Sequence, residues 1–132
     1  MIHLTYCIQR RPDLSAVEFE RRLEDHHAVV ADAAQKLRVA GFEVKRPIST
    51  AWNTCVSQPR GLKRFEPDAI VELRWNTLAD YEFAAGSPDG IAATDSMIES
   101  ERRFVDFAKS SASFVASPIT KPSFRVKQPA ET

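Results

Sequence analysis

The sequence predicts an α+β domain in which helices cover one face of a four-stranded antiparallel sheet. Three observations predict it. Residues 2–9 and 68–75 alternate between apolar and polar side chains, as half-buried strands do. A long amphipathic helix at about residues 16–40 separates these strands, and a second helical section follows the later one. With two shorter strand-like segments, the order becomes β-α-β-β-α-β, the split βαβ or ferredoxin-like arrangement.

The first helix follows a turn at Pro12, which cannot donate a hydrogen bond to a sheet. Ser15 and Glu18 have the spacing of a capping box, in which the hydroxyl accepts from a free amide and the glutamate reaches back. Gly41 is the expected C-terminal stop. Apolar residues recur at helical spacing between these ends: Phe19, Leu23, Val30, Ala33, Ala34 and Leu37.

The section between this helix and the strand at 68–75 is less regular. Residues 42–45 and 50–56 are strand-like in composition, and Pro47 interrupts them. Residues 58–67 contain two prolines and a glycine. We therefore expect the second strand within 42–56, followed by a loop.

The second helical section is broken in two. Asn76 or Thr77 caps a short helix that ends near Ala85, and the glycines and proline of residues 86–90 interrupt it. A further helix is expected to continue to about Phe107. Residues 113–116 then form a short final strand.

The domain is expected to span residues 1–117, and residues 118–132, with three prolines, to form a C-terminal tail. Because the helices cover only one face of the sheet, the other face needs cover. A second copy of the sheet is the economical cover. We therefore expect a homodimer in which two sheets form a dimeric α+β barrel.

Composition excludes several partners. Lys+Arg and Asp+Glu number 18 each, which gives no electrostatic bias towards nucleic acid or anionic membrane. No stretch approaches the roughly 20 apolar residues that span a bilayer. Cys7 and Cys55 lie far apart without zinc-ligand spacing, and the first residues lack a signal-peptide pattern. We expect a cytoplasmic protein with no metal and no nucleic-acid or membrane partner.

Five segments, at residues 1–9, 11–19, 27–30, 67–73 and 104–115, resemble in order the EthD family of dimeric α+β barrel proteins. The resemblance implies a pocket between each sheet and its helices. Genes of family members are often found beside genes for oxygenases or polyketide-tailoring enzymes. Relatives in the wider barrel group act as cofactor-free cyclases, isomerases and decarboxylases, or as haem-binding and monooxygenase-like proteins. The fold alone does not choose among these reactions.

His26 and His27 are the candidate catalytic residues. At about 100° per residue, His26 lies near the middle of the apolar stripe of the first helix and His27 at its edge. A neutral imidazole takes and gives protons near pH 7, whereas the alternative is a buried structural histidine. Consecutive histidines point in different directions, so a two-histidine metal site is not expected. His27 matches the family's histidine, and His26 stands where the family usually has an apolar residue.

Four further residues are candidates for substrate binding: Tyr6, Trp52, Trp75 and Asp95. Tyr6 and Trp75 lie on the apolar faces of their strands, where they either line a pocket or pack in the core. Trp52 falls in the irregular section, where pocket rims often lie. Asp95 and Glu99 are one helical turn apart, and either form a solvated face or orient a histidine.

These residues support three hypotheses. The first is a cofactor-independent lyase or isomerase that cyclises, dehydrates, decarboxylates or moves a proton on a hydrophobic aromatic or polyketide-like metabolite. The second is a non-catalytic accessory protein that binds such a metabolite for an oxygenase pathway. The third is a haem- or flavin-assisted oxygenase. The histidine pair favours the first, without a cofactor.

Overall fold

The computed structural model describes residues 1–117, and the expected tail at 118–132 lies outside the described residues. The element order is that of a split βαβ fold with an extra short helix between the second and third strands. The elements are β1 (Ile2–Ile8), α1 (Ala16–Leu37), β2 (Gly41–Lys45), α2 (Trp52–Ser57), a 3₁₀ turn (Gln58–Arg60), β3 (Ala69–Trp75), α3 (Leu78–Ala85), α4 (Pro88–Glu101) and β4 (Ser111–Ala116).

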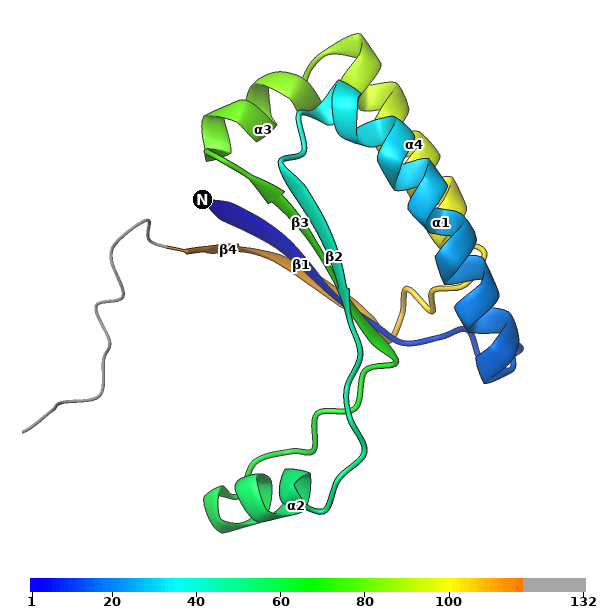
Figure 1. Cartoon of the computed structure of the whole chain (residues 1–132), viewed down its shortest axis with the longest axis vertical. Coiled ribbons are helices and arrows are strands. Elements are labelled where there is room, and N and C mark those ends of the chain that lie inside the picture. Colours follow the sequence, from blue (N-terminus) through cyan, green and yellow to red (C-terminus); the bar gives the residue numbers. More distant parts are fainter. Residues whose placement is uncertain (118–132) are drawn as a thin grey trace, which may run out of the picture.

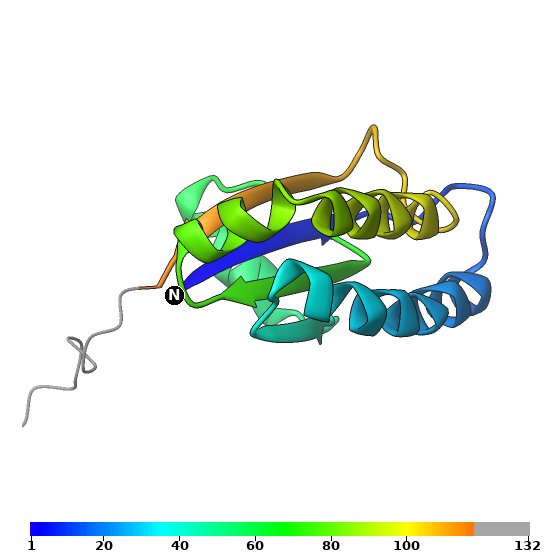
Figure 2. The same cartoon turned by 90° about the horizontal axis from the view of Figure 1, so that it is seen from above.

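The four strands form one antiparallel sheet in the order β2-β3-β1-β4. Figures 1 and 2 show α1, α3 and α4 on the same side of this sheet. The face towards the helices is called the covered face. The opposite face, called the bare face, carries His3, Thr5, Cys7, Ile70, Glu72 and Arg74 on its two central strands.

The core lies between the covered face and the helices, in two clusters of buried side chains. One is built around Phe19, Leu23 and Phe104, and the other around Leu37 and Trp75. Tyr6 packs against both clusters. The regular alternation in β3 places one side chain of every two in this core, which is why the sequence pattern located that strand well.

The ends of α1 differ in part from the expectation. Ser15 caps the helix, since its Oγ accepts from the Glu18 amide at 3.1 Å. The Glu18 carboxylate, however, pairs with Arg21 and Arg22 and does not reach back. The helix ends at Leu37 with Arg38 in the left-handed conformation, at φ 58°, and does not extend to residue 40.

The sequence predicts that Gly41 ends the helix, but Arg38 is the cap and Gly41 begins β2. A Cβ atom there would collide with the guanidinium group of Arg74. The glycine therefore allows the Arg74 side chain to cross this edge of the sheet.

Residues 46–67 form an arm that projects away from the sheet and helices (Figure 1). The strand expected within residues 42–56 forms only in the first part of that range, as β2, and the strand-like residues 50–56 mostly form α2 instead. The sheet ends at Lys45, so these residues have no neighbouring strand, and local bonds decide their conformation. The Asn53 side chain, for example, donates to the carbonyl of Ile48 at 2.9 Å.

The helix expected to reach Phe107 ends at Glu101. Ser87 caps its start, where the Oγ accepts from the Gly90 amide at 3.0 Å. Beyond its end the chain turns, and Val105 bridges to Arg10 before β4 begins. Within residues 1–117, no helix has both the length and the hydropathy to cross a membrane.

Candidate functional site

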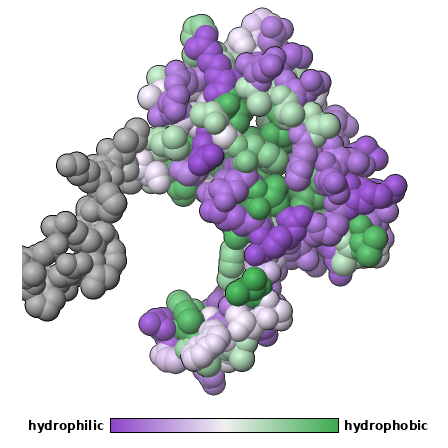
Figure 3. All heavy atoms as spheres, viewed as in Figure 1, coloured by the Kyte–Doolittle hydropathy of each residue, from purple (hydrophilic) through white to green (hydrophobic). Residues whose placement is uncertain are grey.

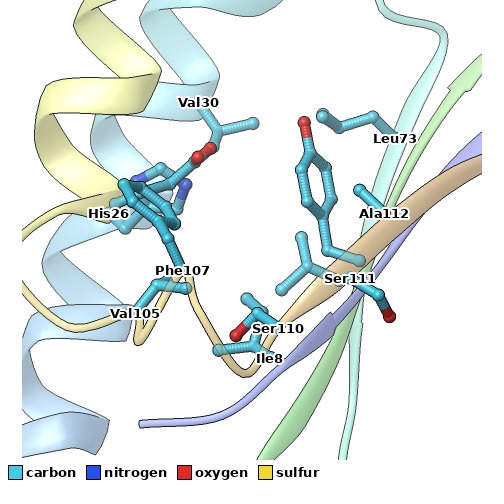
Figure 4. Close-up of a pocket in the computed structure, with 12 residues that line it drawn as sticks. Ile8, His26, Val30, Leu73, Val105, Phe107, Ser110, Ser111 and Ala112 are labelled. Atoms are coloured by element: carbon cyan, nitrogen blue, oxygen red, sulfur yellow. The ribbon is translucent and has the colours of Figure 1, made fainter. Parts of the chain in front are cut away.

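A cavity of about 160 Å³ lies between the covered face and helices α1 and α4 (Figure 4). A cavity on the order of 150 Å³ holds a benzene-sized molecule. Four side chains in its wall are polar and useful for chemistry or binding: Tyr6, His26, Glu101 and Ser110. The rest of the wall is largely apolar, with Ile8, Val30, Val71, Leu73, Val105 and Phe107.

The cavity opens towards the connection between α4 and β4. Phe107, Ser111 and Ala112 line the cavity and are exposed, whereas the residues from β3 and α1 that line it are buried or half-buried. Figure 4 shows Phe107 and His26 together on the helix side of the cavity, opposite the strands. A bound molecule would therefore enter past this connection.

His26 reaches the cavity because the apolar stripe of α1 places it there. The buried residues of α1 recur at alternating steps of three and four, and His26 is the one polar residue among them: Phe19, Leu23, His26, Val30, Ala33 and Leu37. Its side chain is only 3% exposed. The expectation that His26 looks towards the sheet is met.

Ser100 and Phe104 hold the His26 ring in place. Nδ1 lies 2.8 Å from the Ser100 Oγ, and the ring packs edge-on against Phe104 with centroids 5.2 Å apart. Because Nδ1 is occupied by this contact, Nε2 is the ring nitrogen left for the cavity, and Figure 4 shows the ring at the cavity wall. The serine therefore orients the imidazole, as a hydrogen-bond partner orients a catalytic histidine.

Burial lowers the pKa of His26 to about 4, and the neighbouring His27 adds a smaller effect in the same direction. The imidazole is therefore neutral at pH 7. A neutral ring has one nitrogen with a free lone pair and one with a proton. His26 can thus accept a proton from a bound molecule.

Glu101 and Tyr6 face the same cavity, and burial favours the protonated form of both side chains. Burial raises the pKa of Glu101 to about 7, so about half of the molecules carry a neutral carboxylic acid at neutral pH. Burial also raises the pKa of Tyr6, and the nearby Glu101 and Tyr81 add to that effect. Tyr6 therefore stays a neutral hydroxyl donor.

Together these groups make an inverted acid–base pair. The carboxyl group of Glu101 holds its proton at a higher pH than the imidazole of His26, the reverse of their order in water. Neighbouring groups whose pKa values are pushed apart mark the acid and the base of a catalytic site. The arrangement is suited to moving a proton within a small apolar ligand.

His27 lies outside this cavity, and the expectation that it also faces the pocket is corrected. One residue further along α1 turns its side chain to the exposed surface. Its ring packs edge-on against Phe42 of the edge strand β2, with centroids 5.3 Å apart. Of the two histidines, the structure brings only His26 to Tyr6.

The remaining expected binding residues are also elsewhere. Trp75 is 1% exposed in the core, where its Nε1 donates to the Leu37 carbonyl at 2.7 Å. Trp52 is 73% exposed on the arm. Asp95 lies on the exposed side of α4, in a groove against α1 that is separate from the cavity. Tyr6 is the expected binding residue that the cavity includes.

Sequence reasoning missed Glu101 and Ser100. Glu101 lies four residues after Met97 and three before Phe104, so a carboxylate stands on the same apolar stripe. That spacing is the signal that could have found it. Ser100 has no such signal, since its role depends on how α4 packs against α1.

No family model matches this chain, and no curated protein matches it either. Solved structures do match its fold. An EthD family protein from Bacillus halodurans is 13% identical, with a TM-score of 0.52, and the match covers 89% of this chain and 99% of that one. Hydroxynitrile lyase from Passiflora edulis is 10% identical, with a TM-score of 0.57, covering 92% and 96%.

SnoaB, a cofactor-independent oxygenase from Streptomyces nogalater, is 11% identical, with a TM-score of 0.52, over 92% of this chain and 96% of its own. A protein from Bacteroides fragilis, described as dimeric and ferredoxin-like, matches over 86% and 93% at 13% identity, with a TM-score of 0.51. These identities are too low to carry function, but they confirm the predicted fold class. The chain has the ferredoxin-like α+β fold that the EthD family protein also has.

Proposed function

We propose that this protein is a lyase- or isomerase-type enzyme that moves a proton on a small hydrophobic molecule without a cofactor. The observation that carries the proposal is His26, a buried neutral imidazole oriented by Ser100 at an apolar cavity that also holds Glu101 and Tyr6. Solved structures of this fold include a hydroxynitrile lyase and a cofactor-independent oxygenase, which fits small-molecule chemistry.

In the proposed reaction, Nε2 of His26 takes a proton from a carbon next to a carbonyl group. The C–H bond breaks, an N–H bond forms, and the electron pair moves to the carbonyl oxygen to give an enolate. The free imidazole is a weak base, because burial lowers its pKa. The enolate formed beside it attracts the imidazolium, however, and so raises that pKa when the proton must be held.

The enolate then has several outcomes. Return of the proton to another atom completes an isomerisation, and loss of a group from the neighbouring carbon completes an elimination. The cavity wall is largely apolar, so a bound ligand would displace water from it and strengthen the attraction between the charges.

The test is deuterium exchange into hydrophobic ketones in heavy water, followed by mass spectrometry. A positioned acid–base group contributes about 10²–10⁴-fold to rate, so His26→Gln should slow exchange by that factor. His27→Gln is the matched control, because it changes the adjacent but exposed histidine and should keep the rate. Full exchange by His26→Gln would contradict the proposal. A slow His27→Gln with a normal His26→Gln would return the role to His27.

A non-catalytic binding protein is the alternative, and the same cavity supports it. Binding of a ketone without any exchange in wild type would favour that reading over an enzyme. The EthD resemblance, at the level of fold, agrees with either function.

We also propose that the protein is a homodimer through the bare face. No helix in residues 1–117 covers this face, on which Cys7 and Ile70 are half-buried apolar side chains. A second copy packed on the face would cover them. A matching structure from Bacteroides fragilis is described as dimeric.

The arm supports the same conclusion. Figure 3 shows hydrophobic residues on the arm among more polar ones, and several large apolar side chains of the arm are exposed. They are Ile48, Trp52, Val56, Leu62 and Phe65. Clustered exposed apolar side chains are typical of protein–protein contacts. An obligate interface should bury on the order of 2,000 Å² or more.

Light scattering tests the assembly. We expect wild type to be a dimer at micromolar concentration and Ser113→Arg, at an exposed site on the bare face of β4, to dissociate it. The double variant Trp52→Ser/Phe65→Ser should weaken it as well. Val17→Arg adds the same charge at an exposed position of α1 and should leave the dimer intact. A monomeric wild type would refute the proposal.

A further inference from the structure

We propose that the ligand of this cavity is a neutral carbonyl compound with a benzene-sized apolar group, and that Glu101 recognises its carbonyl oxygen as a hydrogen-bond-donating carboxylic acid. The inference rests on the proposed function, because it concerns the same cavity. It adds a class of ligand and a further group that touches it.

The surroundings of Glu101 favour its protonated form. It is the last residue of α4, where the negative end of the helix dipole disfavours an anion. No Lys or Arg lines the cavity, and the carboxylate has no hydrogen bond or ion pair with any side chain of residues 1–117. Burial without a cation raises the pKa of the group, so it keeps its proton to about pH 7.

The same surroundings select against anionic ligands. A ligand carboxylate would meet Glu101, the C-terminal end of α4 and no cation in the wall. Burying an unpaired charge is costly, so such a ligand would lose its hydration without compensation. A ligand carbonyl, in contrast, can accept from the Glu101 carboxylic acid or the Tyr6 hydroxyl.

The size of the cavity sets the apolar part of the ligand. A volume of about 160 Å³ accepts one aromatic ring, and the buried walls of Val30, Val71 and Leu73 match its apolar surface. A larger molecule would extend through the opening beside Phe107, which is exposed.

Glu101 also supplies the acid for the proposed proton transfer. As His26 takes the proton from carbon, the carboxylic acid gives its own proton to the carbonyl oxygen. One C–H and one O–H bond break, one N–H and one O–H bond form, and the product is a neutral enol beside an imidazolium and a carboxylate. The reverse transfer restores both groups, so no further reactant is needed.

Three probes of nearly equal size test the ligand class: acetophenone, α-methylstyrene, in which a CH₂ group replaces the oxygen, and benzoate. Dissociation constants are measured by NMR titration of the full chain at pH 5.5. We expect wild type to bind acetophenone about tenfold more tightly than α-methylstyrene, the effect of one hydrogen bond, and benzoate most weakly. Equal binding of ketone and alkene, tighter binding of benzoate, or no binding by any probe would overturn the proposal.

Variants and pH then identify Glu101 as the donor. The titratable groups that face it are Tyr6 from β1 and His26 from α1, and the pKa shifts of both take their titration away from neutral pH. Affinity for acetophenone should therefore fall above pH 7 in wild type, by about tenfold in all, towards the affinity for α-methylstyrene. Glu101→Gln keeps a neutral donor and should bind equally at pH 5.5 and 8.5, whereas Glu101→Leu should lose the preference for ketone over alkene.

An unchanged wild-type affinity between these two pH values, or a ketone preference retained by Glu101→Leu, would refute the role of Glu101. This outcome is distinct from failure of the proposed function. Binding is measured here without turnover, and the His26 proposal depends on deuterium exchange alone.

Discussion

Two glutamates on opposite faces of the sheet show how differently the two faces treat a charge. Glu72 lies on the bare face, where its carboxylate accepts from Lys45 at 2.6 Å and from Thr5 at 3.0 Å. The hydrogen bond from Lys45 lowers the pKa of Glu72, so it stays ionised. Glu101 is the last residue of α4 and faces the cavity on the covered side of the sheet. Its carboxylate has no hydrogen bond or ion pair with a side chain of residues 1–117, and burial raises its pKa to about 7.

The difference shows which face of the sheet carries groups with shifted pKa values that are suited to proton transfer. On the bare face, the Glu72 carboxylate is paired with Lys45 and accepts a hydrogen bond from Thr5, which favours its charged form. On the covered face, burial disfavours the charged forms of Glu101 and His26, so Glu101 holds its proton more tightly and His26 less tightly than in water. Variants on each face can test this division.

The largest effect is expected for Phe104→Ala on the covered side. The ring is fully buried and packs against Phe19 and His26, with centroids 5.9 Å and 5.2 Å away. Removing it should lower the free energy of unfolding by about 3–5 kcal/mol, measured by denaturant titration. Phe107→Ala is the matched control, and should cost less than about 1 kcal/mol because that ring is exposed. Equal costs would mean that the covered side is not the core.

The second effect is a pH-dependent loss of stability caused by Glu101. Between about pH 4.5 and 7 the carboxyl group ionises in the unfolded chain but stays protonated in the folded one, so wild type loses stability as pH rises. Above pH 7 the loss levels off, at about 3 kcal/mol. Relative to wild type, Glu101→Gln should therefore gain about that amount between pH 4 and pH 8.

Denaturant midpoints at the two pH values measure this gain. Glu99→Gln, at an exposed carboxylate of the same helix, is the control and should show a much smaller change. His26 contributes with the opposite sign, because its lowered pKa makes wild type lose stability as pH falls from about 6.5 to 4. The Glu101→Gln variant retains that loss, so the difference between the two proteins isolates the glutamate.

The sequence predicted the elements well where burial of one face gives a regular period, which is every second residue in a strand and every third or fourth in a helix. The strands at 2–9 and 68–75 and the start of α1 at Ser15 agree with the structure to within a residue or two. The strand-like residues 50–56 do not form a strand, because β-branched and aromatic residues indicate a strand only where a neighbour can pair with them. The arm provides no such neighbour.

The site was predictable in part for the same reason. His26 and Tyr6 lie on apolar stripes that the sequence shows, and both reach the cavity. His27 does not, because its phase places it at the edge of the stripe, where only packing against Phe42 decides its position. Glu101 also lies on such a stripe, through its spacing from Met97 and Phe104, but that spacing alone does not show that its carboxylate faces a cavity.

The third effect concerns the helix that carries His26. Ser15→Ala removes the hydroxyl that accepts from the Glu18 amide and should destabilise the fold by about 1 kcal/mol. Ser96→Ala changes an exposed serine within α4 and serves as the control. An unchanged denaturant midpoint for Ser15→Ala would show that the cap contributes nothing.

The smallest effect is a change in the coupling free energy of the ion pair between Lys45 and Glu72, which tests whether a second copy covers the bare face. Lys45 is half exposed in a single chain, and such pairs contribute about 0.5 kcal/mol and weaken in salt. We therefore expect a double-mutant cycle of Lys45→Met and Glu72→Gln to give about that coupling in the monomeric Ser113→Arg background, with most of it lost in 1 M NaCl. Ser113 and Glu72 lie on either side of Thr5 in one row of the bare face, so the added arginine can reach Glu72. The Trp52→Ser/Phe65→Ser variant, which weakens the dimer without adding a charge to this face, is therefore measured as a second background.

In wild type, a second copy on the bare face would exclude water and ions from the pair. The coupling should then rise to about 1 kcal/mol and respond less to salt, because charges shielded from solvent interact in a lower effective dielectric. Both cycles must use one protein concentration, since dimer stability depends on it. Equal coupling and equal salt dependence in the two backgrounds would mean that the pair faces water in both. The bare face would then be exposed at this edge, and any dimer would have to form through the arm or elsewhere on the sheet.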